Sequence, residues 1–166
     1  MTKKGQPNMA STKYIIQLQV NPSFCLGVAS ATGGTPVVLS NLTGAGNPNT
    51  QWEADPASGL IILAGNTTLC LAYSGTAPQN GTPLIVTPII LGAPSQKWNF
   101  VGNPPAIMSI GAPGFAADNK AGVQSPGNPI TLYQFQTGNL NQAWTFTPVP
   151  VAERYNVQEK ELVSAR

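Results

Sequence analysis

The sequence predicts an all-β domain built from three repeats, and three observations carry this prediction. The three Trp residues of the chain, Trp52, Trp98 and Trp144, each lie 46 residues from the next. A fixed period of this size indicates one structural unit repeated along the chain. Short runs rich in Val, Ile, Leu and Thr alternate with turns, since the chain carries 17 Gly and 16 Pro. No stretch of the chain body has a sustained helical period, so a barrel or a sandwich of short strands is expected.

The residues before each Trp strengthen the repeat. Gln96 and Gln142 each stand two positions before a Trp. In the first repeat Gln51 is adjacent to the Trp, so Thr50 takes the equivalent position while the Trp period is unchanged. We therefore expect three equivalent units, the first of them altered just before its Trp.

Short apolar and β-branched runs between turn residues predict the strands. A Gly-x-Pro turn precedes the third strand of every repeat, and its Pro presets φ where no ladder donor is needed. The predicted strands cover 14–20, 24–28, 36–40, 60–64, 69–73, 84–88, 97–101, 107–110, 115–117, 130–134 and 143–147.

Two strand segments recur in all three repeats. The second strand is FCLGV, LCLAY and FAADN at 24–28, 69–73 and 115–119. The third strand is GTPVVLS, GTPLIVT and GNPITLY at 34–40, 81–87 and 127–133. Together with the Gln-x-Trp pattern, these segments resemble the ricin-B type (R-type) β-trefoil lectin family over about residues 13–148.

The resemblance implies a β-trefoil with three pseudo-symmetric repeats, in which a six-stranded barrel is capped by three hairpins. The family's signatures are a Cys-Leu-Asp-Val-like strand, a strand that ends in Leu-aromatic, and a closing Asn-Gln-x-Trp. Each Trp is then expected in the core, where burial of a large aromatic stabilises the fold by a few kcal/mol. The Gln before it is expected to hold the repeat turn by hydrogen bonds.

The charges divide the chain into a nearly neutral body and two charged ends. Residues 14–149 carry five charged side chains, and the other nine lie outside them. We predict a flexible N-terminal extension at 1–12, a β-trefoil domain at 13–149 and a charged C-terminal tail at 150–166. The three repeats are predicted at about 13–58, 59–105 and 106–149.

In this family a repeat's sugar site needs three side chains. An Asp two residues after the Cys position accepts hydrogen bonds from sugar hydroxyls, because a carboxylate makes charge-assisted bonds. An aromatic ring on the third strand stacks on the apolar face of the pyranose. An Asn immediately before the Gln of Gln-x-Trp completes the polar clamp.

The third repeat alone matches at all three positions. It carries Asp118, Tyr133 and Asn141, and the resemblance adds Gln142 to this carbohydrate-binding set, with Phe135 as the alternative stacking ring. At the same positions the other repeats carry Gly27, Ser40 and Asn49, and then Ala72, Thr87 and Ser95.

Structural explanations for the same residues stay open. Asp118 and Asn119 suit a turn cap, Tyr133 suits a half-buried strand position, and Asn141 suits the turn before the Trp strand. Asn49 shows that the Asn is present in a repeat that lacks the other two residues. Three matches in one repeat nevertheless favour a sugar site there.

The predicted function is that of a carbohydrate-binding lectin for galactose or N-acetylgalactosamine (GalNAc), with one intact site in the third repeat. The alternative is a protein-interaction or structural β-trefoil without sugar binding, including the protease-inhibitor type. An inhibitor of trypsin-type proteases would present a Lys or Arg on an exposed loop. The Pro-containing loops of this chain at 103–105 and 125–129 hold neither.

No enzyme, cofactor or metal site is expected. The chain has no His, the commonest general base and metal ligand. Glu53 and Asp55 lead into a turn, whereas a glycosidase needs opposed carboxylates across a cleft. The motifs of phosphate loops and nucleophile elbows are also missing.

Charge and hydropathy also bear on partners and location. A net charge of +2 without a basic cluster in the body argues against nucleic-acid binding. The apolar runs are far shorter than the ~20 residues of a membrane span, so no membrane insertion is expected. Residues 1–13 lack the apolar region of a secretory signal. We expect a cytoplasmic protein, or one exported by a route without a signal peptide.

Cys25 and Cys70 occupy equivalent positions in two repeats. Family members often pair this Cys with one just past the aromatic position, but Leu42 and Ile89 stand there. We therefore expect two buried free thiols, which agrees with a reducing compartment.

The composition changes after Pro150. Residues 151–166 carry six charges and no Gly or Pro. Val151, Tyr155 and Leu162 could form one face of a short helix. The tail is either a solvated end or an assembly arm, and the second possibility predicts a homo-oligomer.

Overall fold

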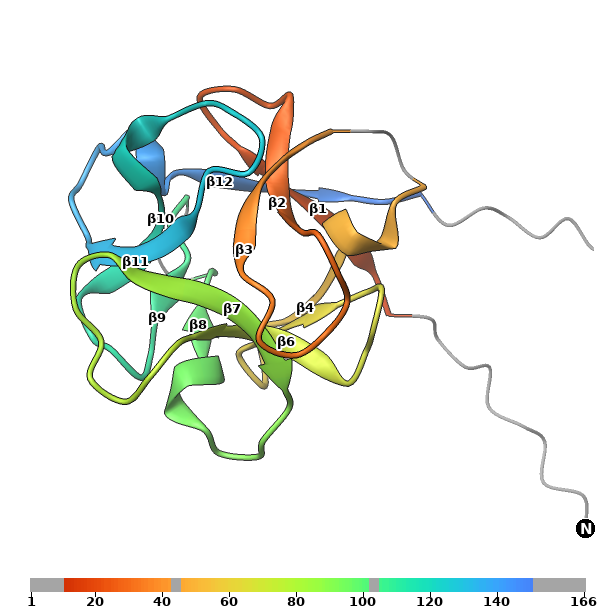
Figure 1. Ribbon diagram of the computed structural model, residues 1–166, viewed down its shortest axis with the longest axis horizontal. Coiled ribbons are helices and arrows are strands. Elements are labelled where there is room, and N and C mark those ends of the chain that lie inside the picture. Colours follow the sequence, from red (N-terminus) through yellow and green to blue (C-terminus); the bar gives the residue numbers. More distant parts are fainter. Residues whose placement is uncertain (1–10, 43–45, 102–104, 151–166) are drawn as a thin grey trace, which may run out of the picture.

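The computed structural model describes residues 11–42, 46–101 and 105–150, which contain twelve strands in one continuous sheet (Figure 1). In chain order these are β1 (Lys13–Leu18), β2 (Phe24–Val28), β3 (Val37–Asn41), β4 (Trp52–Asp55), β5 (Leu60–Leu63), β6 (Leu69–Tyr73), β7 (Thr82–Pro88), β8 (Trp98–Asn99), β9 (Met108–Ser109), β10 (Phe115–Asn119), β11 (Ile130–Gln134) and β12 (Trp144–Pro148). Four short 3₁₀ turns join them, namely η1 (Pro48–Thr50), η2 (Pro94–Gln96), η3 (Lys120–Gly122) and η4 (Leu140–Gln142). None of the helical segments described is long and apolar enough to cross a membrane.

The first and fourth strands of each repeat form a barrel. β1 pairs with both β12 and β4, β4 pairs with β5, and β8 pairs with β9, all antiparallel. Single backbone bonds complete the ring, since Trp98 N donates to Gly59 O and Trp144 N to Pro105 O, each at 2.9 Å. The barrel therefore joins all three repeats through their Trp strands.

The second and third strands form three hairpins in the same register. Cys25 faces Ser40, Cys70 faces Thr87 and Ala116 faces Tyr133 across their respective hairpins. The Gly of each Gly-x-Pro turn donates its N–H to the hairpin of the next repeat, at 2.7–2.8 Å. These glycines are Gly34, Gly81 and Gly127, and all have positive φ between 84° and 89°, which favours Gly. The predicted all-β, β-trefoil fold is thus confirmed.

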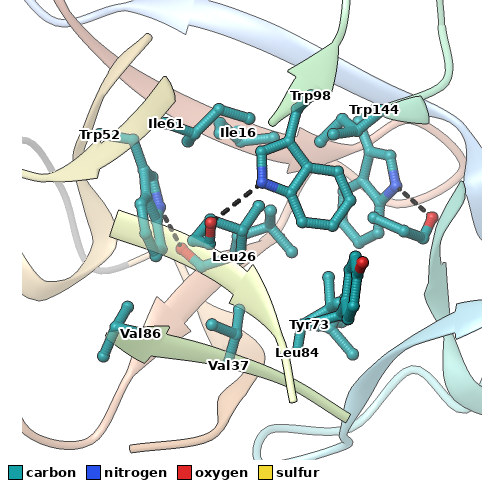
Figure 2. Close-up of a cluster of buried hydrophobic side chains, with 14 of the residues drawn as sticks. Ile16, Leu26, Val37, Trp52, Ile61, Tyr73, Leu84, Val86, Trp98 and Trp144 are labelled. Carbon is teal, nitrogen blue, oxygen red and sulfur yellow. Dashed lines mark hydrogen bonds between the residues drawn. The ribbon is translucent and has the colours of Figure 1, made fainter. Parts of the chain in front are cut away.

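The three Trp side chains lie in the shared core of the barrel and the hairpins (Figure 2). Their exposed fractions are 0%, 1% and 3% for Trp52, Trp98 and Trp144. Each indole N–H donates to a backbone carbonyl of the second strand in its own repeat, at 3.0–3.1 Å. The acceptors are the carbonyls of Leu26, Leu71 and Ala117 (Figure 2). The repeat seen in the sequence is therefore a repeat of one core contact.

The Gln residues before the Trp hold the repeat turns, as expected. Gln96 accepts from Ile90 N at 2.9 Å and donates to Pro88 O at 2.8 Å. In the first repeat Thr50 is buried at the equivalent place, and its hydroxyl donates to Asn47 O at 3.0 Å. Thr50 thus makes a side-chain hydrogen bond within the turn that precedes Trp52.

The predicted strands differ from the observed ones mainly at barrel positions. β4 was not among the predicted runs, because Glu53 and Asp55 have low strand propensity. The run predicted at 97–101 shrinks to Trp98–Asn99, and the run at 107–110 shrinks to Met108–Ser109. The barrel strands of the later repeats are too short for sequence propensity to set their ends.

Both cysteines are free and buried, as expected. Burial raises the pKa of each thiol to about 11, which keeps both protonated and unreactive. Most of the predicted N-terminal extension and nearly all of the C-terminal tail, including its helical face, lie outside the described residues.

Candidate functional site

The third repeat's hairpin, β10–β11, carries the candidate site. Asp118 faces Thr131 and Ala116 faces Tyr133 across this antiparallel pair. Since strand side chains alternate between faces, Asp118, Thr131 and Tyr133 lie on one side of the hairpin. The hairpin thus presents a carboxylate, a hydroxyl and an aromatic ring together.

These side chains open into a pocket of about 440 Å³. This volume lies within the range of about 300–1,000 Å³ that is usual for small-molecule sites. The pocket is lined by Asn80, Gly81, Asp118, Lys120, Ala121, Thr131, Tyr133, Gln136, Asn139 and Asn141. Three of the four predicted binding residues, Asp118, Tyr133 and Asn141, therefore meet in one hollow.

Asp118 is nearly inaccessible, with 4% of its surface exposed. Desolvation by burial raises the pKa of its carboxyl group to about 6, and a hydrogen bond with the Gln142 side chain acts in the opposite direction. A carboxylate held in such a place is a strong acceptor, because little water competes for it. It is well suited to accept hydrogen bonds from ligand hydroxyls.

Gln142, the fourth predicted residue, lies behind the pocket rather than on its surface. It is 1% exposed, accepts from Gln136 N at 2.9 Å and donates to Gln134 O at 3.0 Å. Its amide thus anchors the 134–136 segment and also reaches Asp118. Gln142 positions the site, and direct contact between Gln142 and a sugar stays a prediction.

Tyr133 is the ring in the pocket. It is 39% exposed, so part of its side chain is accessible to a ligand. Phe135, the alternative ring, lines a different apolar hollow of about 200 Å³ that also includes Leu140 and Gly138. The structure thus separates the two aromatic candidates.

Asn141 is held in place by its own turn and by a glycine. Its backbone N–H donates to Asn139 Oδ1 at 3.0 Å, which caps η4. Gly122 approaches its side chain so closely that an added methyl group would lie 2.8 Å from Asn141 Oδ1. Gly122 also has φ +69°, so both space and backbone conformation favour Gly there.

The η3 turn beside Asp118 is strained and tied down. Ala121 has φ +55°, and it is the one non-Gly residue with positive φ among the described residues. Asn128 Nδ2 donates to Asn119 Oδ1 at 2.8 Å and to Lys120 O at 2.9 Å. Asn119 Nδ2 in turn donates to Val123 O at 3.1 Å. The side chain of Asn119 thus makes the hydrogen bonds that hold the turn, whereas the neighbouring Asp118 lines the pocket.

The first repeat has different surroundings at the positions that match the site of the third repeat. A methyl group at Gly27, the Asp position, would collide with the hydroxyl of Ser40. Asn49 Oδ1 is directed at Gly65 of the second repeat, where an added methyl group would also collide. By contrast, the amide of Asn141 lies against Gly122 of its own repeat. The same residue type therefore faces different surroundings in the two repeats.

Several residues of the pocket wall were not predicted from the sequence. Strand alternation with Tyr133 is the signal that could have predicted Thr131. Closeness to Asp118 in the sequence is the signal that could have predicted Lys120. Asn80 and Gly81 come from the second repeat and lie beside β11 because β7 pairs with β11 (Figure 1). Only the order of hairpins in space reveals such neighbours.

Comparisons with known proteins agree with this fold. No curated protein sequence matches the chain at a significant level. Among solved structures, the chain is similar to the designed threefold-symmetric protein ThreeFoil, with a TM-score of 0.70 and 20% identity over 81% of this chain and 97% of that one.

Two natural lectins are also similar. The C-half of an earthworm R-type lectin, in complex with GalNAc, gives a TM-score of 0.65 and 18% identity over 82% of this chain and 98% of that one. A ricin B-like lectin of Macrolepiota procera, in complex with lactose, gives a TM-score of 0.64 and 20% identity over 84% of this chain and 98% of that one. Identities this low bear on the fold alone.

The family model of the ricin-type β-trefoil lectin domain matches residues 2–98, which is more than half of the chain. That match lies over the first two repeats, and the third repeat shares their strand register and Trp contact. Members of the family are in general carbohydrate-binding proteins without catalytic activity. The chain belongs to the ricin-type β-trefoil lectin family.

Proposed function

We propose that this protein binds galactose- or GalNAc-type sugars, without catalysis, in the pocket of its third repeat. The observation that carries the proposal is that Asp118, Tyr133 and Asn141 line one pocket. Membership of a lectin family supports carbohydrate as the ligand class. The GalNAc and lactose bound by two similar lectins support the choice of sugar.

Each of the three side chains has a separate role. Asp118 accepts hydrogen bonds from two sugar hydroxyls, and its burial strengthens them. Tyr133 stacks its exposed face on the apolar face of the pyranose and selects how the ring lies. Asn141 offers both a donor and an acceptor to the neighbouring hydroxyl.

The first experiment is a glycan array with the intact protein and its Asp118→Ala variant. We expect binding to cluster on galactose- or GalNAc-ended glycans and to disappear in the variant. A matched pair of substitutions adds a control, because Asn141 and Asn49 are equivalent positions in two repeats. Asn141→Ala should weaken binding, whereas Asn49→Ala should leave it unchanged.

The outcomes separate the proposal from its alternative. Binding that survives in both Asp118→Ala and Asn141→Ala would place the ligand elsewhere on the molecule. Complete absence of glycan binding by the folded protein would contradict the proposal. It would favour a protein-interaction or structural role for this β-trefoil.

A further inference from the structure

One wall of the pocket comes from the neighbouring repeat. Asn80 and Gly81 lie in the loop between β6 and β7, yet they line the pocket of the third repeat. Gly81 N donates to Leu132 O at 2.8 Å, which holds this loop against β11. Asp118 and Asn80 therefore belong to different repeats and line the same hollow.

The amide of Asn80 has a fixed orientation. Its Oδ1 accepts the backbone N–H of Gln134 at 2.8 Å. A backbone N–H can donate only to the oxygen of a side-chain amide, so the Asn80 atom that faces Gln134 N is its oxygen. The Nδ2 group then keeps both of its donors without a hydrogen-bond partner among the described residues. Asn80 is exposed, so these donors are available to a ligand.

This arrangement occurs once in the threefold fold. The Gly-x-Pro turns start at Gly34, Gly81 and Gly127, so the residues equivalent to Asn80 are Gly33 and Pro126. Neither of these carries a side chain that can donate or accept a hydrogen bond. Beside Gly33 stands Pro88, which is equivalent to Gln134 and has no N–H to offer. The repeat with the complete Asp, Tyr and Asn set is thus also the repeat that receives a neighbour's amide.

We propose that Asn80 is a further ligand-binding residue and that the pocket takes a glycan of at least two saccharide units, the second of them against Asn80. This inference rests on the proposed function of the pocket. The three residues of the third repeat hold the terminal sugar. The Asn80 amide donates to an oxygen of the second sugar, which is a hydroxyl, a ring oxygen or an acetamido carbonyl.

The shape and chemistry of the pocket favour this division. A volume of about 440 Å³ exceeds what a single pyranose ring fills. The strong acceptor, Asp118, belongs to the hairpin, whereas the unpaired donors of Asn80 lie beyond Thr131 and Tyr133 at the β7 side. One neutral hydrogen bond is worth roughly a two- to tenfold gain in affinity. That gain should appear only for ligands long enough to reach Asn80.

The test compares a monosaccharide with disaccharides on the full chain. The probes are methyl β-galactoside, lactose and Galβ1-3GalNAc, with affinities measured by titration calorimetry near pH 7.5. Asn80→Asp keeps an oxygen for Gln134 N–H but removes the donors. Asn80→Gly copies the first repeat and removes the side chain without adding a charge. Circular dichroism checks that both variants are folded.

We expect at least one disaccharide to bind the unaltered protein two- to tenfold more tightly than the monosaccharide. Both variants should lose this advantage while their affinity for methyl β-galactoside stays the same. An advantage that persists in both variants, or no advantage in the unaltered protein, overturns the role of Asn80. Asp118→Ala distinguishes the two proposals, because loss of monosaccharide binding there upholds the proposed function even when Asn80 has no effect. No binding of any probe overturns both.

Discussion

At the scale of single residues, the carboxyl group of Asp118 is central to the proposed binding site. Burial raises the pKa of this group to about 6, although its hydrogen bond with the Gln142 side chain acts to lower the pKa. Lys120 is the other charged residue among those that line the pocket. Asp118 therefore changes from a pure acceptor to a neutral acid within two units of neutral pH.

We predict that sugar binding weakens as the pH falls through about 6. The protonated carboxyl group no longer offers a charged acceptor to two hydroxyls, so the affinity at pH 5 should be about tenfold lower than at pH 8. Calorimetric titration with lactose across this range measures the effect. A profile that stays flat down to pH 4.5 would contradict the role of Asp118. The Asp118→Asn variant, which does not titrate, should bind weakly and without this pH dependence.

The same residue should reduce the stability of the fold above pH 6. A carboxyl group whose pKa is higher in the folded than in the unfolded chain binds more protons when folded, so stability falls as the pH rises between the two values. We predict that Asp118→Asn raises the free energy of unfolding at pH 7.5 by on the order of 1–2 kcal/mol. The gain should vanish near pH 4. Urea unfolding at both pH values measures it, and an equal effect at both would exclude ionisation as the cause.

The sequence was informative about this residue through its repeat and through the family resemblance that the repeats carry. Asp118, Tyr133 and Asn141 were predicted because the third repeat matches the sugar-site pattern that the family resemblance implies, and they line one pocket. Their burial, the pKa of Asp118 and the separation of Tyr133 from Phe135 depend on packing around the hairpin. Neither composition nor spacing contains that information.

At the scale of elements, the η3 turn sets the geometry of the site. It follows β10 directly and places Gly122 against the amide of Asn141. Ala121 and Gly122 both have positive φ, at +55° and +69°. A non-Gly residue in this region costs of order 1 kcal/mol or more. The turn therefore holds strain next to the pocket.

Two neighbouring substitutions in this turn should act in opposite directions. We predict that Ala121→Gly raises the free energy of unfolding by roughly 0.5 kcal/mol, because relief of strain exceeds the added backbone entropy. Gly122→Ala should lower it by about 1 kcal/mol and also weaken sugar binding, because the new methyl group displaces Asn141. Thermal unfolding and lactose titration of both variants test this. Equal behaviour of the two variants would show that the turn does not constrain Asn141.

Elements were predictable where the repeats agree and unpredictable where they differ. The hairpin strands β2, β3, β6 and β7 follow from apolar runs between Gly-Pro turns, and their expected and observed ranges nearly coincide. The strained η3 turn has no counterpart in the other repeats. The Asn80 wall depends on the contact between β7 and β11, which no local pattern encodes.

At the scale of the whole molecule, the threefold core carries a proposed binding site that is not threefold. Three equivalent Trp contacts build the core, while one repeat has the complete binding set. A single shallow site gives modest affinity, and a millimolar dissociation constant corresponds to only about −4 kcal/mol. Lectins of this kind gain strength when several sites act together. With one proposed site per chain, assembly is the expected route to tight binding.

Residues 151–166, which lie outside the described part, are either a solvated end or an assembly arm, and the second alternative predicts an oligomer. Deletion after Pro150 is the natural test, because it keeps the Val149 N to Lys13 O bond of 2.8 Å that follows β12. The truncated protein should be a monomer by sedimentation velocity, whereas the full chain should be larger. Its affinity for free lactose should be unchanged, because the pocket is formed by residues before the deletion. Its retention on a lactose-bearing surface should fall by roughly 10²- to 10⁴-fold, because multivalent attachment is lost. A full chain that sediments as a monomer, or a truncated chain retained as strongly as the full one, would rule out the tail as the source of avidity.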